Sequence, residues 1–266
     1  MRIIRFIDDI GQMRWGVPAG DGRAMPLAGG LFDGGAVAGS PVKIARTLSP
    51  VDPPNIIAIG RNYREHAKEM KAEPQDAEPL IFLKATSSII GPEDDIVLPR
   101  SAPSEVDFEA ELAVIIGRCC KNVSESEAME AVLGYTCAND VSARDCQKRR
   151  DKQWARGKSF DTFCPLGPMI VTKEALPESG VGVRSILNGQ VMQNGHTSDM
   201  VFSVSQLVSY LSHQFTLPPG TVILTGTPAG VGSARTPPVF LQAGDEIVVE
   251  IDGIGRLGNR VRSFSV

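Results

Sequence analysis

The composition places this chain among folded globular proteins. It has 266 residues, of which 42% are hydrophobic and 22% are charged, and this excludes an intrinsically disordered chain. Lysine and arginine number 27 against 31 aspartate and glutamate residues, so the net charge is −4. A nucleic-acid binder needs a basic face, so we expect no nucleic-acid partner. No apolar run approaches the ~18 residues of a membrane helix, so we expect no membrane partner.

The cysteine and histidine content predicts a reduced chain without a zinc site. The five cysteines form no C-x-x-C pair, which is typical of a reducing compartment. They are Cys119, Cys120, Cys137, Cys146 and Cys164. The first nine residues contain no long apolar segment, so we expect no signal peptide and a cytoplasmic protein. The three histidines lack the spacing of a zinc site.

The first part of the chain predicts a small, β-rich N-terminal domain over residues 1–50. Residues 1–18 alternate apolar and polar positions around Asp8-Asp9-Ile10-Gly11, a pattern that predicts a β-hairpin. Residues 40–54 contain four prolines, as expected of a connection between two units. We therefore place the main domain at residues 51–266.

The main domain has the pattern of many short strands and few short helices. Apolar runs predict strands over 55–60, 80–84, 96–98, 111–116, 222–225 and 246–251. Helices are predicted over 61–69, from a capping box at Ser124 through Leu133, and over 203–215. The regular β–α alternation of a doubly wound sheet is missing, so we expect a β-rich α+β fold.

An acidic pair gives the strongest chemical signal. Glu109 and Glu111 stand two apart in Val106-Asp-Phe-Glu-Ala-Glu-Leu-Ala-Val-Ile-Ile116. Alternate residues of a strand point the same way, so both carboxylates would lie on one face. Burying such a pair is costly unless a cation neutralises it, and oxygen ligands favour Mg²⁺, Mn²⁺ or Ca²⁺ over Zn²⁺. The alternative is the exposed polar face of an edge strand.

A third acid and a lysine could complete such a site. Asp140 follows an apolar, strand-like stretch and precedes a predicted helix. It could be a ligand at the end of a strand, or it could cap the helix. Lys158 stands among small and aromatic residues, where it could bind an anion or an oxyanion. The alternative is an ordinary surface lysine.

Two further motifs could contact a substrate. Thr227 lies in the glycine-rich turn Thr225-Gly-Thr-Pro-Ala-Gly-Val-Gly232, whose N–H groups and hydroxyl could hold a carboxylate. The alternative is a tight structural turn. His66 and Glu69 are three apart in a predicted helix and therefore on one face. A carboxylate that orients an imidazole makes a general base, whereas the alternative is an incidental pair on a solvated helix.

Several motifs, taken in this order, resemble those of the fumarylacetoacetate hydrolase family over roughly residues 55–262. They are Gly60-Arg-Asn-Tyr-Arg-Glu-His-Ala-Lys-Glu69, Phe82-Leu-Lys84, Asp107-Phe-Glu-Ala-Glu-Leu112, Asn139-Asp-Val-Ser-Ala-Arg-Asp145, Lys158-Ser-Phe-Asp-Thr-Phe163, Thr225-Gly-Thr-Pro-Ala-Gly-Val-Gly232 and Gly253-Ile-Gly-Arg-Leu-Gly-Asn259. The resemblance implies a mixed β-roll or β-sandwich with short peripheral helices and a small N-terminal domain, as in the shorter bacterial members. It also implies a homodimer.

The resemblance implies roles for individual residues as well. Three carboxylates would hold Mg²⁺ or Mn²⁺: Glu109, Glu111 and Asp140. Three residues would be catalytic: His66, Glu69 and Lys158. Four would bind the substrate: Arg61, Arg144, Gln147 and Thr227. Arg144 and Gln147 would lie one and two turns along a helix after Asp140.

The function that the resemblance implies first is C–C bond hydrolysis. A divalent-metal-dependent hydrolase would cleave a 2,4-diketo acid, of the acylpyruvate or fumarylpyruvate type, and release the metal-bound enolate of pyruvate. The alternative on the same scaffold is an oxaloacetate decarboxylase or a 2-hydroxyhepta-2,4-diene-1,7-dioate isomerase. A further alternative is a non-catalytic, metal-stabilised binding protein. For each enzyme the partner is a small 2-oxo acid.

Overall fold

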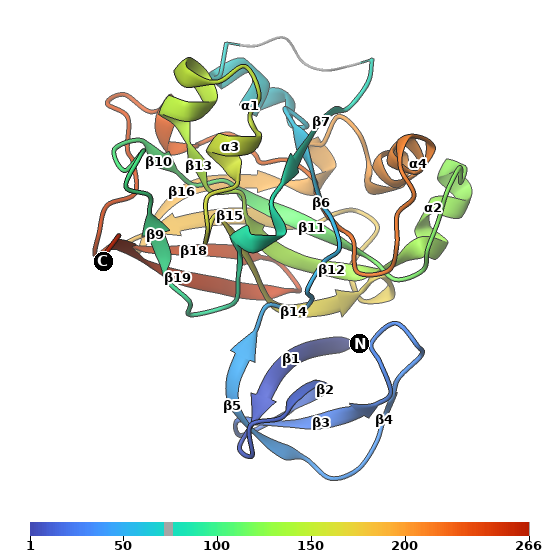
Figure 1. Ribbon diagram of the computed structural model, residues 1–266. Helices are drawn as coiled ribbons and strands as arrows, with labels where there is room; N and C mark the ends of the chain where they lie inside the picture. Colours follow the sequence, from blue (N-terminus) through green and yellow to red (C-terminus); the bar gives the residue numbers. More distant parts are fainter. Residues whose placement is uncertain (72–76, 266) are drawn as a thin grey trace.

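The computed structural model describes residues 1–71 and 77–265, and most of its regular structure is β-strand (Figure 1). The first strands are β1 (Arg2–Asp8), β2 (Met13–Gly20), β3 (Arg23–Ala28), β4 (Ala36–Val37) and β5 (Val42–Leu48). The next are β6 (Ile56–Gly60), β7 (Leu80–Lys84), β8 (Ile89–Ile90), β9 (Ile96–Leu98), β10 (Val106–Asp107), β11 (Ala110–Ile116), β12 (Val132–Asn139) and β13 (Ser142–Ala143). The last are β14 (Cys164–Thr172), β15 (Gly182–Leu187), β16 (Gln190–His196), β17 (Val222–Leu224), β18 (Glu246–Ile251) and β19 (Gly255–Ser263).

The helices are short. The α-helices are α1 (Arg64–Glu69), α2 (Glu125–Ala131), α3 (Ala155–Lys158) and α4 (Val204–Gln214). Single turns of 3-10 helix are η1 (Thr86–Ser88), η3 (Lys173–Ala175), η4 (Thr197–Asp199) and η5 (Gly232–Ala234), and η2 (Cys146–Arg150) is a π-helix. None of the helices in the described ranges has the length and apolar character needed to span a bilayer.

Two sheets form the main layers. The larger sheet has the strand order β2-β3-β5-β1-β14-β12-β11-β17-β6-β7, with β4 beside β3 and β8 beside β14. The smaller sheet has the order β16-β15-β18-β19-β9, and β10 pairs with β13 separately. Both larger sheets are mixed, because β17 runs parallel to β6 and β19 runs parallel to β9. The predicted β-rich α+β fold is therefore confirmed.

The strands β1 to β5 gather at one end of the molecule, below the main body in Figure 1. The predicted hairpin is confirmed, since β1 and β2 pair antiparallel around a turn in which Asp8 accepts the N–H groups of Ile10 and Gln12. At its start, however, β1 also pairs with β14 of the main body, through Arg2 and Val171. The division into two domains at residue 50 stays a prediction.

The strand β11 runs through the centre of the molecule with every residue buried. Successive side chains of β11 point to opposite faces, so those on one face pack into one core cluster and those on the other face into a second. Leu112, Val114 and Ile116 pack with residues of the smaller sheet, such as Val249, whereas Ala113 and Ile115 pack on the opposite side, with β6 and β17 among others. Because alternate side chains share a face, a carboxylate at an odd position of this strand points to the side of Ala113 and Ile115.

Two predicted helix boundaries are wrong. The capping box at Ser124 does start α2, but the helix ends at Ala131, because Val132 begins β12 and pairs with Ile116. The helix predicted directly after Asp140 begins only at Cys146, where the Asp145 side chain accepts the Cys146 N–H. Asp140 therefore does not cap a helix. Since β13 intervenes, Arg144 does not lie one turn along a helix.

Candidate active site

A cavity of about 370 Å³ collects most of the predicted site residues. Eight of the ten line its wall: Arg61, His66, Glu109, Glu111, Arg144, Gln147, Lys158 and Thr227. The other two lie directly behind it, since Glu69 contacts His66 and Asp140 contacts Lys158. A larger cavity of about 630 Å³, beside α2 and α4, contains none of the ten.

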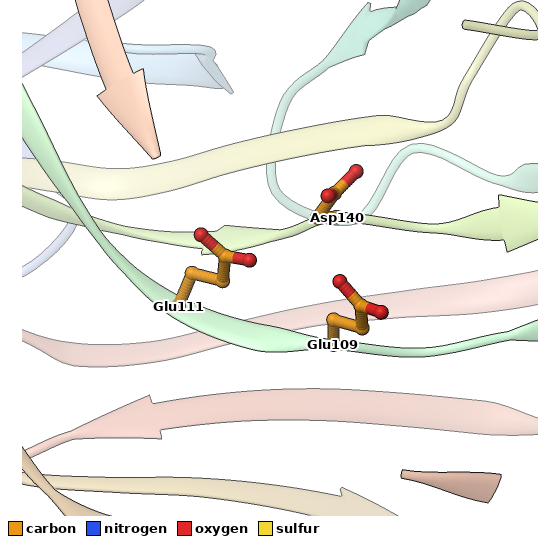
Figure 2. A group of neighbouring side chains, drawn as sticks. All are labelled: Glu109, Glu111 and Asp140. Atoms are coloured by element: carbon orange, nitrogen blue, oxygen red, sulfur yellow. The ribbon is translucent and has the colours of Figure 1, made fainter. Parts of the chain in front are cut away.

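Three carboxylates point toward one another beside this cavity (Figure 2): Glu109 and Glu111 line it, and Asp140 lies behind them. One oxygen each of Glu109, Glu111 and Asp140 can be chosen so that all three lie within 4.8 Å of one another. Sheet register explains the meeting, because Ala110 pairs with Asn139 and so sets Asp140 beside Glu109. All three residues are buried, which rules out the exposed edge strand that was the alternative for Glu109 and Glu111.

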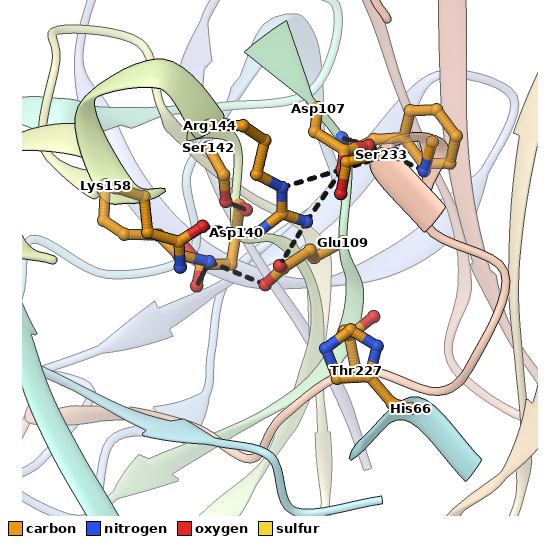
Figure 3. A network of polar contacts seen from close by, with 12 residues as sticks. His66, Asp107, Glu109, Asp140, Ser142, Arg144, Lys158, Thr227 and Ser233 are labelled. Atoms are coloured by element: carbon orange, nitrogen blue, oxygen red, sulfur yellow. Dashed lines mark hydrogen bonds and ion pairs between the residues drawn. The ribbon is translucent and has the colours of Figure 1, made fainter. Parts of the chain in front are cut away.

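Buried cations pair with two of these three acids (Figure 3). Lys158 Nζ lies 2.7 Å from both Glu109 Oε2 and Asp140 Oδ2. Arg144 Nη2 lies 2.7 Å from Glu109 Oε1, and Lys84 Nζ lies 2.5 Å from Asp140 Oδ1. Burial alone would raise the pKa of Glu109, but Lys158 and Arg144 outweigh it and hold this pKa well below its usual range. Lys158 is 2% exposed and therefore is not a surface lysine.

Glu111 is the acid whose charge is not paired. Its Oε2 accepts the Gly226 N–H at 2.7 Å, but no lysine or arginine of residues 1–71 and 77–265 forms an ion pair with it. Burial, followed by the negative charges of Asp140 and Glu109, raises the pKa of Glu111 well above its ordinary value. A cation bound beside these carboxylates would offset this effect and favour the ionised form of Glu111.

A charge count supports the same conclusion. Four buried acids lie in the cluster: Asp107, Glu109, Glu111 and Asp140. Three buried cations face them, namely Lys84, Arg144 and Lys158, so ionisation of all four acids leaves one negative charge without a counterpart. An ion with oxygen ligands only, of the Mg²⁺ type, would reverse this imbalance. The residues therefore fit a divalent cation.

The imidazole of His66 is held from behind by a carboxylate. His66 Nδ1 lies 2.8 Å from Glu69 Oε1 within α1, and Glu69 Oε2 accepts the Gly230 N–H at 2.9 Å. Because a carboxylate only accepts, the proton belongs on Nδ1 and Nε2 keeps a lone pair. His66 is buried and lines the cavity, so the pair is not an incidental one on a solvated helix.

The four predicted substrate-binding residues also lie at the cavity. Arg144 Nη1 donates to Gln147 Oε1 at 2.8 Å, and the Arg61 guanidinium lies 5.6 Å from the centre of the Trp154 ring. The Thr227 hydroxyl donates to the Ala110 carbonyl at 2.8 Å and accepts from Gln193. That hydroxyl hydrogen is therefore used within the protein. The substrate-binding roles stay predictions.

Three buried residues were missed by the sequence analysis. Asp107 could have been found, because it continues the spacing of Glu109 and Glu111 by two residues. Lys84 offered a weaker signal: it shares the inward side of β7 with Phe82. Gln193 offered none. It lies on β16 of the smaller sheet, where its amide accepts the Ala110 N–H and donates to Thr227 and to the Pro228 carbonyl.

Removing the Lys84 ammonium should destabilise the protein strongly. Nζ binds Asp140 and the carbonyl oxygen of Lys158, and the side chain is fully buried. Lys84→Met keeps the length of the side chain but leaves the Asp140 charge short of one partner. We expect the free energy of unfolding to fall by about 3–5 kcal/mol. Urea denaturation measures it.

The control for this prediction is Lys68→Met on α1. Lys68 is exposed and pairs with Glu65 at 2.5 Å, a surface pair three residues apart. Its loss should change the free energy of unfolding by no more than about 0.5 kcal/mol. Equal effects of the two substitutions would contradict the role given to Lys84.

Comparison with known proteins identifies the class of this molecule. The model of the fumarylacetoacetate (FAA) hydrolase C-terminal domain matches residues 55–262. The chain therefore belongs to the fumarylacetoacetate hydrolase family and is an enzyme of that family, as the sequence resemblance predicted.

Individual relatives are similar over most of the chain. The mitochondrial oxaloacetate tautomerase fahd2 of Xenopus laevis is 51% identical over 217 residues, which are 80% of this chain and 67% of the relative. The crystal structure of 5-carboxymethyl-2-hydroxymuconate delta-isomerase from Mycobacterium smegmatis is 42% identical, with a TM-score of 0.88 over 99% of this chain and 100% of that one. The 2-hydroxyhepta-2,4-diene-1,7-dioate isomerase from Mycobacterium marinum is 39% identical, with a TM-score of 0.87 over 100% of both chains.

Proposed function

We propose that this protein is a divalent-metal-dependent isomerase that moves a proton within a 2-oxo dicarboxylic acid, such as between the enol and keto forms of oxaloacetate. One observation carries the proposal. A single cavity holds a carboxylate-oriented imidazole, His66, together with two carboxylates of a cluster suited to a divalent cation, Glu109 and Glu111. The names of the relatives support the same class, since they are a tautomerase and two isomerases.

The proposed cofactor is Mg²⁺ or Mn²⁺. Glu109, Glu111 and Asp140 would hold it, because their oxygens lie close together and one buried negative charge is left uncompensated. When bound, such an ion is a Lewis acid that polarises a 2-oxo group and acidifies the neighbouring C–H bond.

The chain itself would supply the proton transfer. His66 lines the cavity and Glu69 occupies its Nδ1, so Nε2 is the ring nitrogen left to take a proton from one substrate atom and return it to another. Glu69 holds the ring in place, while its own second oxygen is fixed by the Gly230 N–H. The proton that leaves the enol oxygen reappears on carbon, so the reaction needs neither water nor a leaving group.

Cationic groups around the cavity would bind the two carboxylates of the substrate. Four of them line the cavity: Arg61, Arg144, Lys148 and Lys158. Lys148 is an exposed residue beside Ser233, which sets a positive charge at the rim. A dicarboxylate can contact such groups at both ends, whereas a monocarboxylate leaves one end unpaired.

The hydrolase that the sequence analysis put first has weaker support. Hydrolysis needs a water molecule directed at a distal carbonyl, whereas the three relatives described above are named a tautomerase and two isomerases. An isomerase, of 2-hydroxyhepta-2,4-diene-1,7-dioate, was among the alternatives, and isomerisation fits the dyad without that water. Product analysis distinguishes isomerisation from hydrolysis and from decarboxylation.

The test is product analysis with defined metal content. Chelator-stripped protein is supplied with Mg²⁺ or Mn²⁺ and then given enol oxaloacetate or an acylpyruvate. We expect enol oxaloacetate to reach the keto form faster, with its mass unchanged. Gain of water by the acylpyruvate would identify a hydrolase, and loss of CO₂ a decarboxylase. A folded, metal-binding protein that accelerates none of these reactions would support the non-catalytic alternative.

Three further features of the proposal come from the sequence: the homodimer from the family resemblance, the location from the cysteines and the first residues, and the domain boundary from the prolines of residues 40–54. We propose a homodimer, a cytoplasmic location and a boundary near residue 50 between the N-terminal strands and the catalytic domain. Sedimentation measures the first, fluorescence microscopy of the tagged chain in its host cell the second, and limited proteolysis the third.

A further inference from the structure

Asp107 is a buried carboxylate that does not line the cavity but is bound from several sides. Its Oδ1 accepts the N–H groups of Phe108 at 2.9 Å and Gly232 at 2.8 Å. Its Oδ2 accepts the Ser233 N–H at 3.0 Å and lies 2.8 Å from both Nε and Nη2 of Arg144. Three main-chain groups and one guanidinium thus share this one side chain.

The Arg144 guanidinium forms hydrogen bonds through two of its three nitrogens. Nε donates to Asp107 Oδ2 and Nη1 donates to Gln147 Oε1, both at 2.8 Å. Nη2 lies 2.8 Å from Asp107 Oδ2 and 2.7 Å from Glu109 Oε1, which makes two ion pairs, but among the described residues this buried nitrogen has no hydrogen bond of good geometry. Nη1 carries two hydrogens and gives one to Gln147, so the second is left for a ligand in the cavity that Arg144 lines. Figure 3 shows the guanidinium between Asp107 and Glu109.

The loop on the other side of Asp107 approaches it closely. A Cβ atom built on Gly232 would lie 2.7 Å from Asp107 Oδ1 and 1.9 Å from the Val239 carbonyl oxygen, so only glycine fits. The same loop includes Thr227 on the cavity wall and Gly230, which fixes Glu69. One carboxylate therefore connects Arg144 to the loop that carries these contacts.

We infer that Asp107 is a positioning residue for substrate binding. It holds the Arg144 guanidinium and the glycine-rich loop in fixed positions relative to each other. The free Nη1 hydrogen of Arg144 then points at the anionic end of the substrate. This inference rests on the proposed function, in which Arg144 binds that end. A purely structural role would affect the stability of the protein but not its affinity for ligands.

The test is Asp107→Asn, which keeps the shape but puts an amide NH₂ where Arg144 and Ser233 need an acceptor. We expect the KM for oxaloacetate to rise about tenfold or more, while kcat stays within about threefold. The Kd for oxalate, a small dicarboxylate, should rise by a similar factor in the Mg²⁺-loaded protein. Calorimetry measures this Kd without turnover.

Asp8→Asn is the matched control. Asp8 is also a buried carboxylate that accepts main-chain N–H groups and an arginine, Arg14, but it lies in the N-terminal hairpin. It should lower the melting temperature and leave the KM and the oxalate Kd unchanged. The same result for Asp107→Asn would overturn the inference.

Two further variants keep the test decisive. In an Arg144→Gln background, Asp107→Asn should add less than about twofold to the KM, because its effect passes through the arginine. If Asp107→Asn does not fold, Asp107→Glu keeps the charge one methylene out of place and should still raise the oxalate Kd. A wild-type protein that neither binds oxalate nor converts a 2-oxo acid would instead contradict the proposed function.

Discussion

Replacing His66 by glutamine is expected to lower kcat by about 10²–10⁴-fold, the range for loss of a general base. Glutamine fills a similar space and can still meet Glu69 with its amide, but it offers no lone pair of suitable basicity to the cavity. Binding of Mn²⁺ should be unchanged, because His66 contributes no oxygen to the carboxylate cluster. Steady-state kinetics of the isomerisation measure kcat, and electron paramagnetic resonance measures free Mn²⁺.

The control for His66 is His213→Gln on α4. His213 is exposed, and its Nδ1 contacts the Ser209 carbonyl in the same helix. It lies outside the residues that line the cavity, so its replacement should leave kcat within about twofold. Full activity of the His66 variant would show that another group moves the proton.

Replacing Glu111 by glutamine is expected to abolish metal-dependent activity and, at the same time, to stabilise the metal-free protein. The substitution keeps the size and removes a buried carboxylate that pairs with no lysine or arginine of the part of the chain that the structure describes. An amide oxygen is a much weaker ligand for a hard cation than a carboxylate, so the Kd for Mn²⁺ should rise at least about 100-fold. The melting temperature of the metal-free variant should rise, because like charges no longer meet at Asp140 and Glu109.

Glu246→Gln on β18 is the control for Glu111. Glu246 is exposed and lies on the smaller sheet, so its replacement should alter neither the Mn²⁺ affinity nor the melting temperature measurably. If Glu111→Gln bound Mn²⁺ as tightly as the wild type, the carboxylate cluster would not be the metal site. If it lowered the melting temperature, the charge at this position would already be compensated.

The parts of the site that the sequence predicted are those that depend on local periodicity. The spacing of two in a strand placed Glu109 and Glu111 together, and the spacing of three in a helix placed His66 against Glu69. The pattern around Asp140 left open whether it is a ligand at a strand end or a helix cap, and only the resemblance assigned it to the cluster, because its neighbourhood follows from the pairing of Ala110 with Asn139 in β11 and β12. Nothing in the local sequence fixes that register.

The parts that escaped prediction depend on contacts between distant segments. Lys84 reaches Asp140 across 56 residues, and Gln193 reaches Ala110 across 83. A buried polar residue is recognisable only once its partner is known, since lysines and glutamines are usually exposed. The fold class was more accessible, because many short apolar runs separated by glycine and proline indicate sheets whatever their order.

The amide of Gln193 has a consequence for how the candidate site is assembled. It belongs to the smaller sheet, yet all three of its hydrogen bonds end on β11 and on the loop after β17, which belong to the other layer: Ala110, Thr227 and Pro228. A chain with only the larger sheet assembled would keep the direct bond from the Thr227 hydroxyl to the Ala110 carbonyl, but it would leave the Ala110 N–H and the Pro228 carbonyl without the partner that Gln193 supplies. Docking of the two layers therefore completes the hydrogen bonds of this part of the cavity wall.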